Sequence, residues 1–317
     1  MRLRLLALAT IVSLIAGACA GGASPSVPSS TTASPSPSKP AEIATPLAEL
    51  VVGGDRPVTV HVPASYDASR PAPLVILLHG YSGSGQGNAD YFHLAPAADA
   101  RGYIYAYPDG TIDSNGNRFW NATDACCNFD KAGVDDVAYL TGVIAEIQAK
   151  LAIDPKRIAL VGHSNGGFMS YRFACEQAGL VAAIVSLAGA SFADPAECAP
   201  SEPVSVAQIH GTADDVIRYE GGALTNGPYP GAEETAEAWA TYDGCGETPS
   251  PLSAKVDVDE VLADGADPAE TSVVEWSGCK SGATVQLWTI PKGGHVPAIS
   301  PSFADSVMDF LVDHPKP

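Results

Sequence analysis

The chain has 317 residues, of which 46% are hydrophobic and 17% charged, and its formal net charge is −19. So acidic a surface disfavours nucleic acids and anionic lipids as partners, because both carry negative charge themselves. Beyond the N-terminal segment, the sequence contains no run of about eighteen apolar residues that would suit a membrane-spanning helix. Composition therefore indicates one folded domain with a large apolar core.

The N-terminal residues have the pattern of an export signal. Two arginines precede an apolar run from Leu5 to Ile15, and small residues then lead to Cys19. The run is too short to span a bilayer, and we expect residues 1–19 to be a signal peptide. The four residues that end at Cys19 resemble a bacterial lipobox, which predicts a lipid on Cys19 as the protein's attachment to the membrane. Plain secretion without a lipid is the alternative.

A segment rich in Ser, Pro, Thr, Ala and Gly follows at residues 20–41. It has no apolar periodicity and cannot bury enough surface to order itself, so we expect a disordered linker. Residues 42–317 then make up the folded domain.

Strands and helices alternate through the first half of this domain. Leu47–Val52 and Pro57–His61 are typical of an opening hairpin. The continuous apolar run Leu74–Leu78 suits a strand that is buried on both faces of a parallel sheet. In chain order there follow a helix at Ala89–Arg101, a strand at Tyr103–Tyr107, and a helix whose apolar residues recur every three or four positions from Val137 to Leu151.

The second half continues the alternation. Its expected elements are, in order, a strand at Arg157–Val161, a helix that ends near Gln177, strands at Ala182–Leu187 and Val204–Ile209, a helix at Glu233–Tyr242, a strand at Val285–Ile290 and a helix at Phe303–Leu311. The polar segment Gly246–Glu270 is expected to be an irregular surface excursion. Alternation of this kind predicts an α/β fold with a mainly parallel sheet and helices on both faces.

The sequence Gly162-His163-Ser164-Asn165-Gly166 is a G-x-S-x-G pattern between a predicted strand and a predicted helix. That context is typical of a nucleophile elbow, a turn so tight that a side chain at either glycine would collide with the neighbouring elements. The serine would then lie at a helix N-terminus, where the dipole favours a developing oxyanion. An ordinary glycine-rich turn is the alternative, but the placement favours Ser164 as a nucleophile.

A nucleophilic serine needs a base, and the base needs an acidic partner to orient it. Asp214 and Asp215 follow the predicted strand Val204–Ile209, and His295 follows the strand Val285–Ile290. Their order after Ser164 is the order that the nucleophile elbow predicts. We therefore expect His295 to be the base and one of the two aspartates to be its partner.

The oxyanion hole needs two backbone N–H groups near the nucleophile. We expect one from Asn165, the residue after the serine, and one from Tyr81, in the glycine-rich loop after Leu74–Leu78. His79 and His163 lie beside these elements in the sequence, and Trp120 lies in the long loop after the strand that ends at Tyr107. All three are candidate substrate contacts, although a structural role is the alternative for each.

Five stretches resemble those of a known family: PLVILLHGYSGS, DACCNFDKAGVDDVAYL, IDPKRIALVGHSNGGFMSYRFACE, HGTADDVIRYEGG and IPKGGH. They are similar to the bacterial polyhydroxybutyrate depolymerase and feruloyl esterase family, which is related to carbohydrate esterase family one. The resemblance covers about Val58 to Phe310 and implies an α/β-hydrolase esterase with Ser164, Asp214 and His295 as its triad. It also favours Asp214 over Asp215. The sequence departs from the family at Val296, where Trp is common, and at Ile217-Arg218, where Val-Pro is common, and both departures lie beside the site.

An exported chain with this many cysteines is expected to contain disulfides. Cys175 and Cys198 lie on successive elements and can meet. A bond between Cys245 and Cys279 would close a loop around the polar excursion. The adjacent Cys126 and Cys127 remain, either joined to each other or left as thiols. The spacing does not suit a metal site, because ligands normally have a gap between them.

These observations predict a monomeric extracellular serine esterase that needs no cofactor. It would cleave hydroxybutyrate, feruloyl or acetyl esters through an acyl-enzyme. One alternative is a serine peptidase of the prolyl-oligopeptidase type, although the chain lacks the additional domain of such enzymes. Another is a surface-anchored binding lipoprotein, which a complete triad disfavours.

Overall fold

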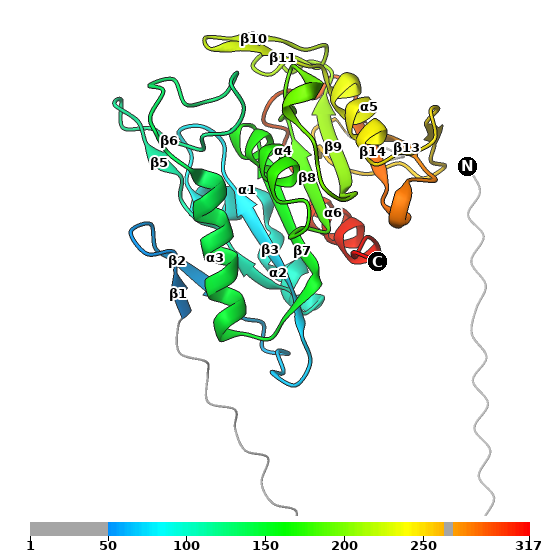
Figure 1. Ribbon diagram of the computed structural model, residues 1–317. Coiled ribbons are helices and arrows are strands. Elements are labelled where there is room, and N and C mark those ends of the chain that lie inside the picture. The colour runs from blue at the N-terminus through cyan, green and yellow to red at the C-terminus, as the bar shows by residue number, and fades with distance from the viewer. Residues whose placement is uncertain (1–49, 263–268) are drawn as a thin grey trace, which may run out of the picture. The chain divides into compact units, whose positions relative to one another are not determined.

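The computed structural model describes residues 50–262 and 269–317 (Figure 1). The predicted signal peptide, the lipid site at Cys19 and the predicted linker therefore lie outside the described residues, as does the beginning of the first predicted strand. The residues that are described belong to one compact unit.

A ten-stranded sheet runs through this part of the chain, with the strand order β1-β2-β4-β3-β7-β8-β9-β14-β13-β12. Its six central strands are parallel, and the strands at both edges are antiparallel. The strands are β1 (Leu50–Val52), β2 (Val58–His61), β3 (Ala72–Leu78), β4 (Ile104–Ala106), β7 (Ile153–His163), β8 (Ala183–Leu187), β9 (Ser205–Gly211), β12 (Ser250–Pro251), β13 (Ser272–Trp276) and β14 (Val285–Ile290). Two small hairpins lie outside the sheet, β5 (Thr111–Ile112) with β6 (Arg118–Phe119) and β10 (Gly222–Leu224) with β11 (Gly227–Tyr229).

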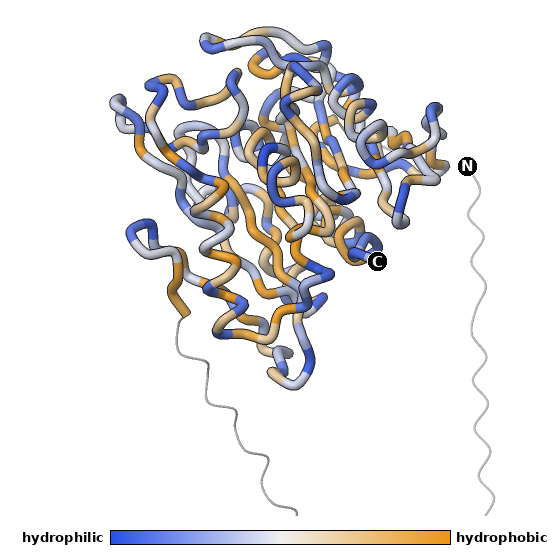
Figure 2. The backbone as a smooth tube through the Cα atoms, viewed as in Figure 1, coloured by the Kyte–Doolittle hydropathy of each residue, from blue (hydrophilic) through white to orange (hydrophobic). Residues whose placement is uncertain are grey.

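Helices cover both faces of the sheet, as expected. They are α1 (Gly85–Phe92), α2 (Leu94–Ala100), α3 (Asp136–Lys150), α4 (Asn165–Glu176), α5 (Ala232–Tyr242) and α6 (Phe303–Asp313). Alternate residues of β3 point to opposite faces. Leu74 and Ile76 pack into a core with α3, α4 and α5, which lie in front of the sheet in Figure 1. Val75 and Leu77 pack into a second core with α1, α2 and α6. Figure 2 shows the central strands as the most hydrophobic part of the chain. This architecture is the α/β-hydrolase fold.

Two expected elements differ in the structure. The single helix predicted at Ala89–Arg101 is two helices, α1 and α2, which are separated at His93 (φ 51°). Pro96 explains the break, because proline lacks the N–H that a continuous helix would use and its ring would crowd the preceding turn. The polar excursion contains β12, and its return strand β13 pairs antiparallel with β14. The sequence of β13, Ser-Val-Val-Glu-Trp, has neither a continuous apolar run nor a regular alternation, so no pattern marked this strand near the edge of the sheet.

Three disulfides lie within the described ranges, between Cys175 and Cys198, between Cys245 and Cys279, and between the neighbours Cys126 and Cys127. The first joins the end of α4 to the loop after β8. The second closes the polar excursion at its base. These are the pairs that the sequence suggested, with the adjacent cysteines joined rather than free.

Candidate active site

Ser164 occupies a sharp turn between β7 and α4. Its backbone φ is 52°, in the left-handed region that residues with a side chain rarely adopt. The flanking glycines allow this turn, since a Cβ on Gly162 would overlap the backbone of Gly166 and a Cβ on Gly166 would overlap the carbonyl group of Leu78. Strain of this kind persists only where the surrounding structure imposes it. The turn therefore has the geometry of a nucleophile elbow, with Ser164 at the N-terminus of α4.

Ser164 is the first of three hydrogen-bonded side chains. Its Oγ lies 3.0 Å from Nε2 of His295, and Nδ1 of His295 lies 2.8 Å from Oδ2 of Asp214. Asp214 follows β9 and His295 follows β14, and these parallel neighbours end at the same edge of the sheet. The alternative acid, Asp215, is exposed, whereas Asp214 is buried. The structure therefore brings Ser164, His295 and Asp214 together and leaves Asp215 outside.

Asp214 is surrounded by hydrogen-bond donors. Its Oδ1 accepts from the amides of Val216 and Ile217, each at 2.9 Å, and its Oδ2 also lies 3.3 Å from Nε2 of His210. Burial acts to raise the pKa of Asp214, but the hydrogen bonds from His210 and His295 outweigh burial and hold this pKa well below its usual range. Asp214 is therefore ionised at neutral pH, so it can orient the His295 ring and stabilise its protonated form.

A buried hydrogen-bond chain fixes His210 behind Asp214. The Tyr171 hydroxyl donates to Oε1 of Gln208 at 2.7 Å, and Nε2 of Gln208 lies 3.0 Å from Nδ1 of His210. Because the amide Nε2 can only donate, Nδ1 of His210 accepts and the ring proton lies on the other nitrogen. That Nε2 donates to the carbonyl of Ile217 at 2.7 Å, next to the carboxylate of Asp214. His210 therefore supports Asp214 as a neutral donor.

The side chains of His163 and Tyr91 hold the loop that carries His295. The carbonyl group of His295 lies 3.0 Å from Nε2 of His163, and the two imidazole rings are 5.1 Å apart. Burial lowers the pKa of His163 to about 4, so its ring is neutral and donates this hydrogen bond. The Tyr91 hydroxyl donates to the carbonyl of Pro297 at 2.8 Å. His163 does line the cavity described below, but its ring nitrogen is engaged with the loop of the base.

The loop after β3 passes directly beside the nucleophile. A Cβ on Gly80 would lie 3.3 Å from the Cβ of Ser164. His79 fixes this loop, because its Nδ1 donates to the carbonyl of Gly80 at 2.7 Å and its Nε2 accepts from the amide of Gly110 at 2.9 Å. Burial lowers the pKa of His79, in agreement with a neutral ring. His79 was expected to contact substrate, yet both of its nitrogens serve the loop, so the structure gives it a positioning role.

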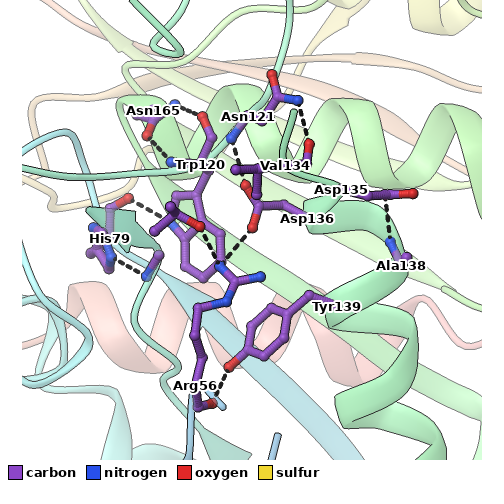
Figure 3. Close-up of polar contacts among 12 residues, drawn as sticks. Arg56, His79, Trp120, Asn121, Val134, Asp135, Asp136, Ala138, Tyr139 and Asn165 are labelled. Carbon is purple, nitrogen blue, oxygen red and sulfur yellow. Dashed lines mark hydrogen bonds and ion pairs between the residues drawn. The ribbon is translucent and has the colours of Figure 1, made fainter. Parts of the chain in front are cut away.

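The Trp120 side chain is fully buried and does not line the cavity, which corrects the expectation that it contacts substrate. Figure 3 shows what it does instead. Its Nε1 donates to the carbonyl of His79 at 3.1 Å. Its backbone N–H donates to Oδ1 of Asn165 at 2.7 Å, and Nδ2 of Asn165 donates back to its carbonyl at 3.0 Å. Trp120 therefore ties the loop after β3 to the residue that follows the nucleophile. The sequence could not predict this role, because a large aromatic residue in a loop near a site can be buried beneath the cavity as well as exposed in it.

An ion pair lies next to Trp120 in Figure 3. Arg56 Nη1 contacts Oδ1 of Asp136 at 2.7 Å, and the guanidinium lies 3.6 Å from the ring centre of Tyr139. Oδ2 of Asp136 accepts from the amide of Asn121 at 2.7 Å. Asp136 is fully buried, and a buried carboxylate of this kind needs such partners. The neighbouring Asp135 is the N-cap of α3, and its Oδ1 accepts from the amide of Ala138 at 2.8 Å.

Tyr81, the second expected oxyanion donor, is held by its own side chain. Its hydroxyl donates to Oδ2 of Asp113 at 2.5 Å, and Oδ1 of Asp113 accepts from the amides of Asn115 and Asn117. Asn165 is the first residue of α4, so its N–H has no acceptor within the helix. Both backbone N–H groups therefore belong to segments fixed next to Ser164.

A cavity of about 470 Å³ opens over Ser164 and His295. The loop from His79 to Ser84 forms one wall, and further lining residues that the sequence did not suggest are Gly87, Asn88, Tyr91, Arg118 and Val296. Those residues come from α1, β6 and the loop of the base, and no local motif marks them.

Residues 50–262 and 269–317 contain no group of three or more His, Cys, Asp or Glu side chains arranged to hold a metal ion. They also contain no helix that is both long and apolar enough to cross a membrane.

Comparison with known proteins places these observations in a family. Residues 64–230 match the Phospholipase/Carboxylesterase family. Feruloyl esterase B of Piromyces equi is 30% identical over 248 residues, which cover 76% of this chain and 42% of that protein, so the chain spans less than half of its length. A protein of Nocardia uniformis subsp. tsuyamanensis named "Putative esterase NocK" is 30% identical over 344 residues, and the match covers 97% of each chain.

Solved structures share the fold at low sequence identity. Acetyl xylan esterase from Aspergillus awamori superposes with a TM-score of 0.58 at 16% identity, over 84% of this chain and 99% of that one. The ferulic acid esterase of Anaeromyces mucronatus has a TM-score of 0.50 at 14% identity, over 84% of this chain and 89% of that one. At these identities the likeness concerns the fold alone.

Proposed function

We propose that this chain, a member of the Phospholipase/Carboxylesterase family, hydrolyses carboxylic esters. In this proposal Ser164 is the nucleophile, His295 is the base and Asp214 is the acidic partner of the base. The observation that carries this proposal is the unbroken path of hydrogen bonds from Ser164 Oγ through the His295 ring to Asp214, at 3.0 and 2.8 Å. Membership of an esterase family also argues against the peptidase alternative.

The reaction proceeds in two halves. Ser164 Oγ attacks the ester carbonyl carbon while Nε2 of His295 takes the hydroxyl proton, and a tetrahedral intermediate forms. His295 then gives this proton to the departing alkoxide, and the acyl group remains on Ser164. Water, deprotonated by His295, attacks the acyl-enzyme, and the acid leaves as the hydroxyl of Ser164 is restored. Asp214 stays ionised throughout and stabilises the protonated His295.

The negative oxygen of each tetrahedral intermediate is held by the N–H groups of Tyr81 and Asn165. Fixed donors stabilise the charge that develops in the transition state without having to reorganise. The hydrogen bonds of His79 and Trp120 to the two segments support this assignment. These residues act through the backbone, without contacting the ester.

The substrates are hydroxybutyrate, feruloyl or acetyl esters. The names of the relatives favour the second and third, since they include feruloyl esterases and an acetyl xylan esterase. The three disulfides of the described chain fit an oxidising, extracellular compartment. Attachment through a lipid on Cys19 stays a prediction. Detergent partitioning of the protein from its host, compared with Cys19→Ser, would test it, and a wild-type protein found wholly in the culture medium would contradict it.

Hydrolysis of p-nitrophenyl acetate by purified protein tests the proposed reaction. Ser164→Ala and His295→Ala should each lower turnover by several orders of magnitude, about 10⁴–10⁶-fold, and the double variant should lose little more, since the two residues act as one unit. A serine-directed organophosphonate should label Ser164 in the wild type. Ser306→Ala, which changes a serine on α6, serves as the control. Near-normal turnover of either single variant would overturn the assignment.

A further inference from the structure

We propose that a second cavity beside Ser164 binds the carbohydrate that forms the alcohol part of the ester, a proposal that rests on ester hydrolysis by Ser164. This second cavity measures about 520 Å³ and is lined by residues of β2, α1 and β6 and by the segment after β4. It shares Ser84 and Arg118 with the cavity over Ser164. Because the same two residues line both, a ligand that reaches Ser164 can continue into the second cavity.

The lining of the second cavity is suited to a ligand with many hydroxyl groups. Planar polar side chains surround it, namely the imidazole of His61, the amide of Gln86, the phenol of Tyr107, the carboxylate of Asp109 and the guanidinium of Arg118. Together they offer both donors and acceptors, as adjacent sugar hydroxyls require. The aromatic rings add apolar faces on which the C–H groups of a sugar can pack.

These side chains are held in place in the absence of ligand. The rings of His61 and Tyr107 are stacked, with centres 5.1 Å apart and an angle of 22° between the planes. The Tyr107 hydroxyl lies 2.9 Å from Nε2 of His61 and donates to Oε1 of Gln86 at 3.1 Å. A fixed arrangement lowers the entropy that binding costs, which is what a specific subsite requires.

Arg118, which lines both cavities, forms an ion pair with Asp109 of the second cavity. Arg118 Nε contacts Oδ2 of Asp109 at 3.0 Å, and the other carboxylate oxygen accepts from the amide of Gly85 at 2.7 Å. The amide of Ser82 donates to the carbonyl of Arg118 at 2.8 Å, so the ion pair is anchored to the loop beside Ser164. The subsite is therefore in a fixed position relative to the reacting ester.

The same lining disfavours a polyester as the alcohol part. A hydroxyalkanoate chain carries carbonyl groups but no hydrogen-bond donors along its length. It could donate no hydrogen bond to the Asp109 carboxylate or the Gln86 carbonyl, and covering their remaining lone pairs without a donor costs free energy. A sugar supplies these donors. Among the candidate substrates, esters on a carbohydrate therefore fit this cavity best.

The test compares two acetyl esters that differ only in the alcohol, acetylated xylotriose and ethyl acetate. Both release an alkoxide, so the ratio of their kcat/KM values reports what the alcohol part contributes. In the wild type this ratio should favour the xylotriose ester. In the double variant Gln86→Ala, Tyr107→Phe it should fall about tenfold through a higher KM for the xylotriose ester, as expected for the loss of hydrogen bonds worth about 1.4 kcal/mol in total. Gln148→Ala, an exposed glutamine on α3, is the matched control and should leave the ratio unchanged.

Binding provides a readout that does not depend on turnover. Calorimetry with unesterified xylotriose should detect binding to the Ser164→Ala protein and weaker binding when Gln86→Ala and Tyr107→Phe are added. An unchanged ratio, an equal fall for both esters, or no difference in xylotriose binding overturns the subsite. If the wild type cleaves ethyl acetate but its ratio does not respond to the variants, the subsite alone is wrong. If it cleaves neither ester, the proposed function fails as well.

Discussion

The two sides of Ser164 are built in opposite ways. On one side, the loops after β9 and β14 carry Asp214 and His295, whose side chains are the proposed reacting groups. Two backbone amides hold the Asp214 carboxylate, and the His163 side chain holds the backbone of His295. On the other side, the proposed oxyanion donors are backbone N–H groups, that of Tyr81 in the loop after β3 and that of Asn165 in α4, and side chains such as His79 and Trp120 hold the loop. We call the first the acid–base side and the second the oxyanion side.

This reversal has a consequence for mutations. A substitution on the acid–base side can remove a reacting group outright. A substitution on the oxyanion side cannot remove a backbone N–H and only displaces it by loosening its support. Expected losses of activity are therefore larger on the acid–base side, and they should appear in kcat on both.

The largest effect in this comparison is expected for Asp214→Asn. The amide would keep the size of the side chain but would no longer stabilise protonated His295, and it would favour the wrong ring tautomer. A fall in kcat of about 10⁴-fold for p-nitrophenyl acetate is expected, as for the same change in other Ser-His-Asp enzymes. Asp215→Asn is the matched control at the neighbouring, exposed position, and its kcat should change less than about threefold. The reverse order of severity would exchange the roles of the two aspartates.

A smaller effect is expected on the oxyanion side for Trp120→Phe. This change keeps an aromatic ring but removes the Nε1 donor to the His79 carbonyl. Loss of a whole oxyanion donor costs about 10²–10³-fold in kcat, so a donor that is merely displaced should cost about tenfold, with little change in KM. A trifluoromethyl ketone, which mimics the tetrahedral intermediate, should bind more weakly by a similar factor.

Trp239→Phe is the matched control for this experiment. Trp239 is also fully buried, and its Nε1 donates to the Ser191 hydroxyl at 3.3 Å, but it belongs to α5. It should lose comparable packing and one hydrogen bond without a change in kcat. An equal fall in kcat for both tryptophan variants would show that Trp120 contributes only to general stability.

The two sides also differ in how far the sequence could predict them. Ser164, Asp214 and His295 each follow a strand with a recognisable apolar run, and the order of such elements places them at one edge of the sheet. The supports of the oxyanion side come from pairs that are distant in the sequence, such as Arg56 with Asp136 and Trp120 with Asn165. No local pattern marks such a pair, so Trp120 was assigned to the wrong role and the ion pair of Asp136 with Arg56 was not predicted.

The helices and strands show the same limit. Periodicity located each central strand, because burial on both faces leaves a continuous apolar run. It missed β13 near the sheet edge, where Glu275 interrupts the apolar residues and pairs with Gln286. Periodicity also predicted one helix where the structure has α1 and α2. The apolar spacing continues across the break, although Pro96 marks it in the sequence.

The smallest expected effect concerns the thermal stability of the protein. It follows from a comparison of two buried carboxylates near opposite ends of β9. Asp214 lies beyond its C-terminal end and accepts hydrogen bonds from two amides and two histidines. Asp243 lies near its N-terminal end and is also fully buried, but there Oδ1 accepts only from the amide of Val204, at 3.2 Å. Among the described residues its Oδ2 has no hydrogen-bond partner. Burial therefore raises the pKa of Asp243 to about 7, whereas the pKa of Asp214 is lowered.

This difference predicts how stability depends on pH. Between the usual aspartate pKa of about 4 and the raised value of about 7, the folded protein holds a proton on Asp243 that the unfolded chain has released. The free energy of unfolding therefore falls as pH rises through this window. Asp243→Asn keeps the shape of the side chain without its charge. At pH 8 it should increase the free energy of unfolding by about 1–2 kcal/mol and raise Tm by a few degrees, whereas at pH 4 it should change Tm little. Calorimetry at both pH values measures this, with the exposed Asp313→Asn as control and kcat expected to stay at the wild-type value at pH 8. A lower Tm at pH 8 for Asp243→Asn would show that the ionised carboxylate stabilises the fold, and that the two ends of β9 do not differ as the hydrogen bonds indicate.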